Sequence, residues 1–311
     1  MIKAENLSMT FRTADMKEPF RALKDLNCTI PDGSIYGLVG ANGAGKSTLL
    51  RLISGVYRPT SGNVLIDGEV VWENPTAKEK TVYVSDELYF LPQANLRTMA
   101  KFYQSLYPAF SMERYRELLE VFPLDEKVPL NRFSKGMRRQ AATVLGLSTM
   151  AQYLLFDETF DGLDPVMRDL VKKILYNDIL ERNSTTIITS HSLRELEDTC
   201  DQLALLHEGG VVFESDLQSL KTELFKVQLA YGVPFSKEKF SSLQILSYEQ
   251  TGSVCSMILR GERESTETYL WSTEPLLCEF LPLNLEEVFL YETEALGYTF
   301  TPPKKEGGSE Q

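Results

Sequence analysis

The residues Gly40 to Ser47 have the types and spacing of a loop that binds phosphate. The segment reads Gly-Ala-Asn-Gly-Ala-Gly-Lys-Ser, which matches GxxxxGK[ST], and it directly follows an apolar run at Ile35–Val39. Glycines let the main chain fold tightly, so that its N–H groups and the start of the next helix point at an anion. We expect Lys46 to reach the β- and γ-phosphates of a nucleotide, and the Ser47 hydroxyl to ligate Mg²⁺. The residues expected to contact the nucleotide are Gly40, Asn42, Gly43, Ala44, Gly45, Lys46, Ser47 and Thr48.

Two adjacent carboxylates, Asp157 and Glu158, directly follow an apolar run at Tyr153–Phe156. In open α/β sheets, ligands bind at the edge where the strands reach their carboxyl ends. At that edge we expect Asp157 to anchor Mg²⁺ and Glu158 to orient or deprotonate the attacking water, a catalytic role. Taken alone, the acidic pair could be a solvated strand end and the glycine-rich segment a structural turn, so both motifs need independent support.

The elements that must position these residues alternate along the chain. Short apolar runs bounded by Gly, Asp and Ser alternate with longer helical patterns, which predicts an α/β fold with buried strands. Thr48–Ile53 continues the phosphate loop as a helix, and apolar residues at helical spacing predict an amphipathic helix over Met112–Phe122. The expected strands are Ile35–Val39, Val64–Ile66, Val82–Val84, Tyr153–Phe156, Thr185–Thr189 and Leu203–Leu206.

The pattern changes near residue 220, which predicts a second, small α/β domain. Its expected strands are Phe225–Ala230, Leu243–Tyr248 and Val254–Leu259, with a turn at Thr251-Gly252. A final helix is expected to begin with a capping box, Asn284 and Glu287, and to end at Gly297. We therefore expect a main domain over residues 1–219, an accessory domain over 220–300 and a disordered tail over 301–311, where Pro, Gly and charge dominate.

A net charge of −12 disfavours partners that are themselves anionic. It would repel nucleic-acid phosphates and anionic lipid headgroups, so neither DNA nor RNA is expected as a main partner. Met1–Phe11 lacks the apolar core of a signal peptide, and the longest uncharged run, Ala141–Phe156, is too short and polar to span a bilayer. We expect a cytoplasmic protein whose four widely spaced cysteines are buried reduced thiols.

Three further segments complete a set of motifs in a fixed order. Phe133-Ser134-Lys135-Gly136-Met137 lies about 20 residues before the acidic pair and resembles the signature usually written LSGGQ. Phe160–Pro165 resembles a D-loop, and His191 matches a switch histidine. By the order and spacing of these motifs, residues 1–215 resemble the ATP-binding-cassette (ABC) ATPases. The resemblance implies a P-loop ABC cassette, in which a mixed sheet forms the core and a helical subdomain carries the signature.

The resemblance also implies an ATPase that uses ATP and Mg²⁺ to drive a separate transmembrane permease. In that family two subunits sandwich two ATP molecules, and the signature of one faces the phosphate loop of the other. Ser134, Gly136 and Asp164 would then contact nucleotide, His191 would act in catalysis and Phe11 would stack on adenine. The implied partners are the permease, which would hold the chain at the inner face of the membrane, and a second ATP-binding subunit, identical or similar.

Two motifs depart from the family's pattern. The family places a glutamine after the strand that corresponds to Val82–Val84, and here Asp86 stands there, or Glu87 if the alignment slips by one residue. As a hard oxygen ligand, Asp86 could bind Mg²⁺ and serve the catalytic site, although an acidic surface loop is the alternative. In the signature, Lys135 and Met137 replace the usual Gly and Gln, while the small Ser and Gly positions remain.

The C-terminal ending loosely resembles that of ATPases from bacterial drug, antibiotic and polysaccharide exporters, which implies an exporter subunit. The module could pack onto the ATPase domain or serve regulation or dimerisation. A soluble ABC ATPase in translation or DNA maintenance is the alternative function, and a switch that barely hydrolyses ATP is a third. The single cassette and the acidity favour the transporter, and the presence of Lys46, Glu158 and His191 argues against the inactive switch.

Overall fold

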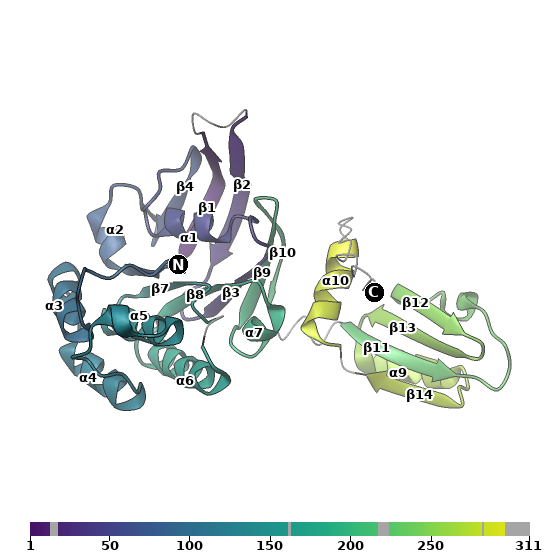
Figure 1. Ribbon diagram of the computed structural model, residues 1–311. Helices are drawn as coiled ribbons and strands as arrows, with labels where there is room; N and C mark the ends of the chain where they lie inside the picture. Colours follow the sequence, from purple (N-terminus) through teal and green to yellow (C-terminus); the bar gives the residue numbers. More distant parts are fainter. Residues whose placement is uncertain (13–17, 161–162, 217–223, 282, 296–311) are drawn as a thin grey trace, which may run out of the picture. The chain divides into compact units, whose positions relative to one another are not determined.

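A computed structural model describes residues 1–12, 18–160, 163–216, 224–281 and 283–295, with only the main chain at residues 292, 293 and 295 (Figure 1). The chain divides into two units after Ser215, and each is described by itself. The domain boundary expected at residue 219, the tail expected over 301–311 and the helix end expected at Gly297 lie outside the described residues. So do Asp161 and Gly162 of the expected D-loop.

An antiparallel sheet opens the first unit, with strand order β2-β1-β4-β5. Its strands are β1 (Ile2–Phe11), β2 (Phe20–Ile30), β4 (Ser61–Ile66) and β5 (Glu69–Val70). The pairing of β1 with β2 shifts register at several points, and Asn6 and Asp25 each have a φ of 47°. Only the end of β4 was predicted from the sequence, because these irregularities interrupt the alternation of apolar and polar residues that marks a strand.

The buried runs predicted from the sequence form a second sheet, with strand order β10-β9-β3-β8-β7-β6. Its strands are β3 (Ile35–Val39), β6 (Thr81–Val84), β7 (Tyr153–Asp157), β8 (Thr185–Ser190), β9 (Gln202–His207) and β10 (Gly210–Asp216). The pairs from β9 to β6 are parallel, and every residue of β3, β7 and β8 is buried. Five of the predicted strands are confirmed here, as β3, β6, β7, β8 and β9. Because they run in parallel, their carboxyl ends meet at one edge.

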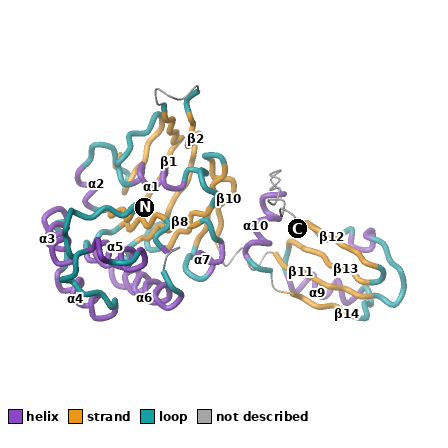
Figure 2. Tube along the Cα trace, viewed as in Figure 1, coloured by secondary structure: helices purple, strands orange, loops and turns teal. Residues whose placement is uncertain are grey.

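Helices complete the first unit (Figure 2). They are α1 (Lys46–Ile53), α2 (Pro75–Glu79), α3 (Leu96–Leu106), α4 (Met112–Val121), α5 (Lys135–Ser148), α6 (Pro165–Arg182) and α7 (Leu193–Glu197), with a 3₁₀ turn at Leu130–Arg132. Leu49 and Leu50 of α1 share one core cluster with residues from both sheets. The helices α3, α4 and α5 pack together and form the expected helical subdomain. Buried Asp178 of α6 pairs with Arg114 of α4 and with Arg182.

The signature segment forms the beginning of α5 rather than a loop before it. Ser134 is the N-cap, because its Oγ accepts a hydrogen bond from the N–H of Met137 at 3.2 Å, so the helix begins at Lys135, inside the signature segment. Ala141–Ser148 is buried, which explains the long uncharged run. In the part of the chain that the structure describes, no helix has the length and apolar character needed to cross a membrane.

The second unit has its own antiparallel sheet, with strand order β12-β13-β11-β14. Its elements are β11 (Leu224–Ala230), a 3₁₀ turn at Lys237–Phe240, β12 (Gln244–Thr251), β13 (Val254–Arg260), α9 (Arg263–Ser272), β14 (Leu277–Leu281) and α10 (Leu285–Ala295). The sequence predicted β11, β12, β13 and α10, but neither α9 nor β14. Leu270 of α9 packs into an apolar cluster with Val227, Phe240 and Met257.

The predicted capping box is present at the start of α10. Asn284 Oδ1 accepts a hydrogen bond from the N–H of Glu287 at 2.8 Å, and Glu287 Oε2 accepts one from the N–H of Asn284 at 3.2 Å. Each side chain therefore satisfies an N–H group that the helix itself cannot.

All four cysteines are unpaired. Cys28, Cys200 and Cys255 are buried and Cys278 is half-buried, and burial raises the pKa of the Cys255 thiol to about 11. A raised pKa keeps the thiol protonated and therefore unreactive at neutral pH. Three of the four cysteines are thus buried, as expected, whereas Cys278 is only half-buried.

Candidate nucleotide-binding site

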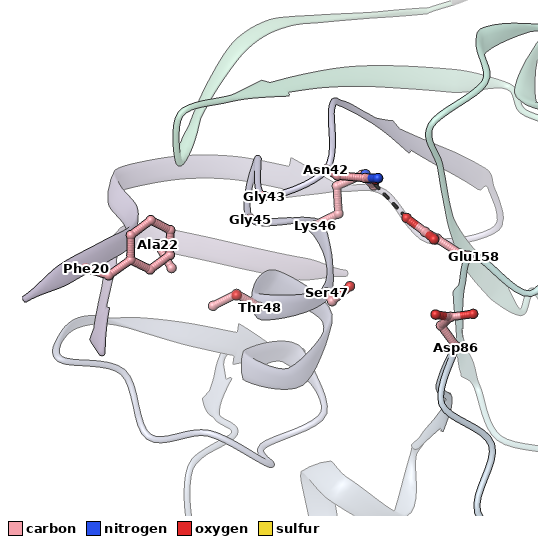
Figure 3. Close-up of a pocket in the computed structure, with 10 residues that line it drawn as sticks. All are labelled: Phe20, Ala22, Asn42, Gly43, Gly45, Lys46, Ser47, Thr48, Asp86 and Glu158. Carbon is pink, nitrogen blue, oxygen red and sulfur yellow. Dashed lines mark ion pairs between the residues drawn. The ribbon is translucent and has the colours of Figure 1, made fainter. Parts of the chain in front are cut away.

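A hollow of about 240 Å³ lies where the phosphate loop meets the carboxyl ends of β6 and β7. Its lining residues are Phe20, Ala22, Asn42, Gly43, Gly45, Lys46, Ser47, Thr48, Asp86 and Glu158. Figure 3 shows Phe20 at one end, Asp86 and Glu158 at the other, and the phosphate loop between them. Of the predicted loop residues, Gly40 and Ala44 do not line the hollow, and both are buried beneath it.

Two glycines let the loop between β3 and α1 pass close to its neighbours. Gly45 has a φ of 109°, and a Cβ there would lie 2.8 Å from the carbonyl oxygen of Ala22. A Cβ at Gly40 would lie 2.5 Å from the carbonyl oxygen of Leu206. No side chain fits at either position, so both positions require glycine. Directly after Gly45 the chain enters α1 at Lys46. The first N–H groups of that helix have no partner within it and can bind an anion.

Lys46 brings a buried positive charge to this hollow. Its side chain is only 4% exposed, and its Nζ donates to the carbonyl oxygens of Gly40 at 2.7 Å and Ala41 at 3.3 Å. It also pairs with Glu158 Oε1 at 3.5 Å. The ammonium group is therefore held between the loop and the acid that follows β7. That placement suits the binding of phosphate oxygens.

The carboxylate of Asp157 lies directly beside Ser47 and accepts hydrogen bonds from three hydroxyl groups. Its Oδ1 accepts hydrogen bonds from Ser47 Oγ at 3.0 Å and Thr189 Oγ1 at 2.8 Å, and its Oδ2 accepts one from Tyr83 OH at 2.8 Å. The residue is 1% exposed, so these donors replace water. Burial, and then the charge of Asp157, raise the pKa of Tyr83 to about 12. The phenol therefore remains a donor at neutral pH.

Glu158 adopts a backbone conformation that is uncommon for a residue with a side chain, with a φ of 49°. Its N–H donates to Thr189 Oγ1 at 2.9 Å, which fixes the turn after β7. The turn directs the carboxylate into the hollow (Figure 3). Such strained positions gather at functional sites.

Asp86 lines the same hollow, whereas Glu87 does not. The Oδ1 atom of Asp86 accepts a hydrogen bond from Arg139 Nη2 at 2.7 Å. The Arg139 side chain on α5 is 7% exposed and that of Asp86 is 44% exposed. One ion pair thus connects the hollow to the helix that begins with the signature.

The aromatic ring on the wall of the hollow belongs to Phe20 rather than to Phe11. Phe11 and Phe20 are directly paired across β1 and β2. The ring of Phe11 instead makes an edge contact with Tyr57, at 5.5 Å between ring centroids. The structure therefore offers Phe20 as an aromatic neighbour of a nucleotide that the sequence analysis did not name.

Four further predicted site residues do not line the hollow. Ser134 is exposed at the N-terminus of α5, and Gly136 is half-buried in its first turn. Asp164 is exposed and caps α6 through its Oδ1, which accepts from the N–H of Met167 at 3.0 Å. His191 is exposed and directly follows β8. The structure thus brings together the phosphate loop, Asp86, Asp157 and Glu158, and leaves the signature residues at the surface.

Comparisons with known proteins support this picture. The family model described as ABC transporter matches residues 23–161. The ABC transporter ATP-binding protein YtrB of Bacillus subtilis is 30% identical over 270 residues, which cover 87% of this chain and 92% of YtrB. This chain belongs to the ABC transporter ATP-binding proteins. The bacitracin transport ATP-binding protein BcrA of Bacillus licheniformis is 30% identical over 224 residues, covering 69% of this chain and 72% of BcrA.

A solved structure of the ATP-binding subunit of an ABC transporter has the same fold as the first part of the chain. Its TM-score is 0.62 at 24% identity, and the match covers 71% of this chain and 91% of that one. The P-loop ABC cassette predicted from the sequence is thereby confirmed. As an ABC transporter ATP-binding protein, the chain binds ATP and hydrolyses it to energise transport. ABC ATPase subunits dimerise and pair with permeases.

Proposed function

We propose that this chain is the ATPase subunit of an exporter and that its described hollow is the ATP site. The convergence of Lys46, Ser47 and Glu158 on one hollow, with Asp157 beside Ser47, carries the proposal. These residues come from two segments far apart in the sequence. Together they supply a phosphate-binding cation, two oxygen ligands for a metal and a base for water.

Mg²⁺ fits the donor set of this site. Ser47 Oγ and Asp157 Oδ1 are 3.0 Å apart, and both are hard oxygen donors beside the phosphate loop. Within the described ranges no cluster of three or more His, Cys, Asp and Glu could hold a metal. Mg²⁺ commonly binds through one or two carboxylates together with substrate phosphates, so a sparse site is expected. Asp86 would add a further carboxylate. The ion would neutralise charge on the phosphates.

The roles of the remaining residues follow from their places. Lys46 would bind the β- and γ-phosphates, and Glu158 would accept a proton from the attacking water. His191, at the carboxyl end of β8, would contact the terminal phosphate from the same edge of the sheet. Phe20 or its strand partner Phe11 would stack on adenine.

Dimerisation would complete each site. Ser134 and Gly136 lie at the exposed N-terminus of α5, outside the hollow of their own chain. A helix N-terminus favours phosphate, so the signature of one subunit suits ATP bound to the phosphate loop of another. ATP would then bridge the two surfaces, and loss of its γ-phosphate would loosen the dimer. The second subunit would be a copy of this chain or a similar one.

The permease would dock beside the signature helix. Residues 88–94, which follow Asp86, line a groove of about 400 Å³ together with Leu130, Asn131 and Arg138. Tyr89 in this groove is 77% exposed, as suits an aromatic residue that a partner covers. Docking there would place the chain at the cytoplasmic face of the membrane. The similarity to BcrA, a bacitracin transport protein, supports the exporter assignment.

Two substitutions test the ATPase site. Lys46→Ala should abolish ATP binding at micromolar nucleotide, because it removes the cation held in the hollow. Glu158→Gln should retain ATP binding and lower the rate of phosphate release by a factor of about 10² to 10⁴, since an amide cannot accept the proton. Calorimetry measures the binding and a phosphate-release assay the rate. Unchanged binding in Lys46→Ala, or parent-like release in Glu158→Gln, would contradict the proposed site.

A further inference from the structure

Tyr83 holds a position that no motif assigns to it. It lies on β6, the edge strand that β7 and β8 separate from β3, and pairs in register with Leu155 of β7. Its ring packs against the core cluster that contains Leu49 and Leu50 of α1. Packing against this core cluster holds the ring in place. Its hydroxyl group reaches Asp157 Oδ2 at 2.8 Å.

The two oxygen atoms of Asp157 have different surroundings. Oδ1 faces Ser47 and Thr189, whose hydroxyl groups lie 3.0 Å and 2.8 Å away. Oδ2 accepts the hydrogen bond from Tyr83. Ser47 belongs to the metal-binding end of the phosphate loop, so Oδ1 is the oxygen that faces the expected Mg²⁺ position. Tyr83 secures the other oxygen and prevents the carboxylate from turning about its Cβ–Cγ bond.

We propose that Tyr83 is a positioning residue that orients Asp157 so that a single oxygen, Oδ1, is presented to Mg²⁺. This inference rests on the proposed function, because it assumes that Asp157 is a metal ligand. Residues that hydrogen-bond to metal ligands commonly set metal affinity without touching the metal. The hydroxyl group of Tyr83 also interacts with Arg51 and Ser85. Neither of these residues lines the hollow, so Tyr83 reaches the nucleotide through Asp157. ATP binding in the absence of metal should therefore not depend on its hydroxyl group.

The test compares Tyr83→Phe with Tyr36→Phe. Both substitutions remove a phenolic hydroxyl group that donates to a carboxylate, but the partner of Tyr36 is Glu214, 2.8 Å away and apart from the hollow. Mn²⁺ replaces Mg²⁺ as an oxygen-seeking probe, and its free concentration is measured by electron paramagnetic resonance with a non-hydrolysable ATP analogue. ATP binding in EDTA is measured in parallel by calorimetry. The melting temperature of each variant checks its fold.

Tyr83→Phe should bind ATP in EDTA like the parent and bind Mn²⁺ about 10-fold more weakly in the ternary complex, as expected for loss of a group that supports a ligand. Tyr36→Phe should match the parent in both measurements. In an Asp157→Asn background, Tyr83→Phe should cause no further loss, because the two residues act as one unit.

Each other outcome decides against the inference. Parent-like Mn²⁺ affinity in Tyr83→Phe would show that the hydroxyl group does not position Asp157. Loss of ATP binding in EDTA would place Tyr83 in the nucleotide site or in the stability of the fold. An equal further loss in the Asp157→Asn background would separate the two residues. A parent protein that fails to bind ATP in EDTA or with Mn²⁺ would instead overturn the proposed function.

Discussion

At the scale of single residues, Arg139 connects the hollow to the helix that begins with the signature. Its guanidinium group is buried, and the carboxylate of Asp86 accepts its Nη2–H at 2.7 Å. A buried charge is costly when its partner is removed. Because Asp86 is partly exposed, water can solvate part of the charge of this ion pair. The pair therefore contributes less to the stability of the fold than a fully buried pair would.

Substitution of Asp86 should affect two separate properties, the stability of the fold and the Mg²⁺ concentration needed for ATP hydrolysis. Asp86→Ala should lower the free energy of unfolding by about 1 kcal/mol, because Arg139 loses its charged acceptor. Asp86→Asn retains an oxygen acceptor and should be less destabilising. Both variants should raise the Mg²⁺ concentration needed for half-maximal ATP hydrolysis by about tenfold, or about 1.4 kcal/mol. Thermal unfolding and Mg²⁺ titration of phosphate release measure the two effects.

Glu87→Ala is the matched control for this prediction. Glu87 is the neighbouring acid, it is exposed and it does not line the hollow. The control should match the parent in stability and in Mg²⁺ requirement. Mg²⁺ titrations that shift for Glu87→Ala but not for Asp86→Asn would assign the family's glutamine position to Glu87.

The chain's own spacing predicted much of the site at this scale. Lys46, Ser47, Asp157 and Glu158 lie in motifs whose residues are adjacent, so a local pattern was sufficient to find them. Tyr83 and Arg139 carried no such signal. Their contacts arise from the pairing of β6 with β7 and from the position of α5, and neither strand register nor helix placement can be read from a single sequence.

At the scale of elements, predictions succeeded where burial was complete. The strands β3 and β7 are buried on both faces and therefore appear as continuous apolar runs. The strands β1 and β2 are exposed at many positions and contain register shifts, so their alternation is interrupted. The helix α6 was not predicted, although Asp164 caps it, Pro165 follows, and the buried residues Met167, Val171 and Leu175 recur at helical spacing. The local pattern therefore carried the signals for this helix.

The capping box of α10 provides a test at this scale. Asn284→Ala removes the acceptor for the Glu287 N–H and should destabilise the start of α10 by about 1 kcal/mol. Amide hydrogen exchange over residues 285–291 should accelerate accordingly, while ATP hydrolysis should remain at the parental rate. Ser236→Ala is the control, since Ser236 precedes a 3₁₀ turn without making a capping hydrogen bond. Identical exchange in Asn284→Ala and the parent would contradict a stabilising role for the box.

At the scale of the whole molecule, the first unit carries the two parts of the proposed ATP sandwich on separate elements rather than in one closed site. Its hollow holds the phosphate loop and the acids, and its signature lies exposed on a separate element. A chain built this way is expected to act only with a second ATP-binding subunit. The second unit has its own core and sheet, and the residues that line the hollow all belong to the first unit.

Glu158→Gln should accumulate as an ATP-dependent dimer, because hydrolysis is the step that separates the proposed sandwich. Size-exclusion chromatography with and without Mg-ATP should detect it, first for this chain alone and then with its permease. The parent should associate only transiently, and Lys46→Ala combined with Glu158→Gln should remain monomeric. If hydrolysis stops in Glu158→Gln but ATP causes no association in either setting, the sandwich mechanism is wrong while the chemistry stands.

The pairing of Asp86 with Arg139 also constrains how this sequence can change over generations. A mutation of Asp86 to glutamine, the family's usual residue, would leave the buried Arg139 without a negative partner. A mutation of Arg139 alone would leave an extra negative charge beside the phosphates of ATP. Sequences that descend from this chain should therefore keep both residues or replace both. Among close homologues, positions 86 and 139 should covary, with an acidic residue at position 86 wherever position 139 is an arginine.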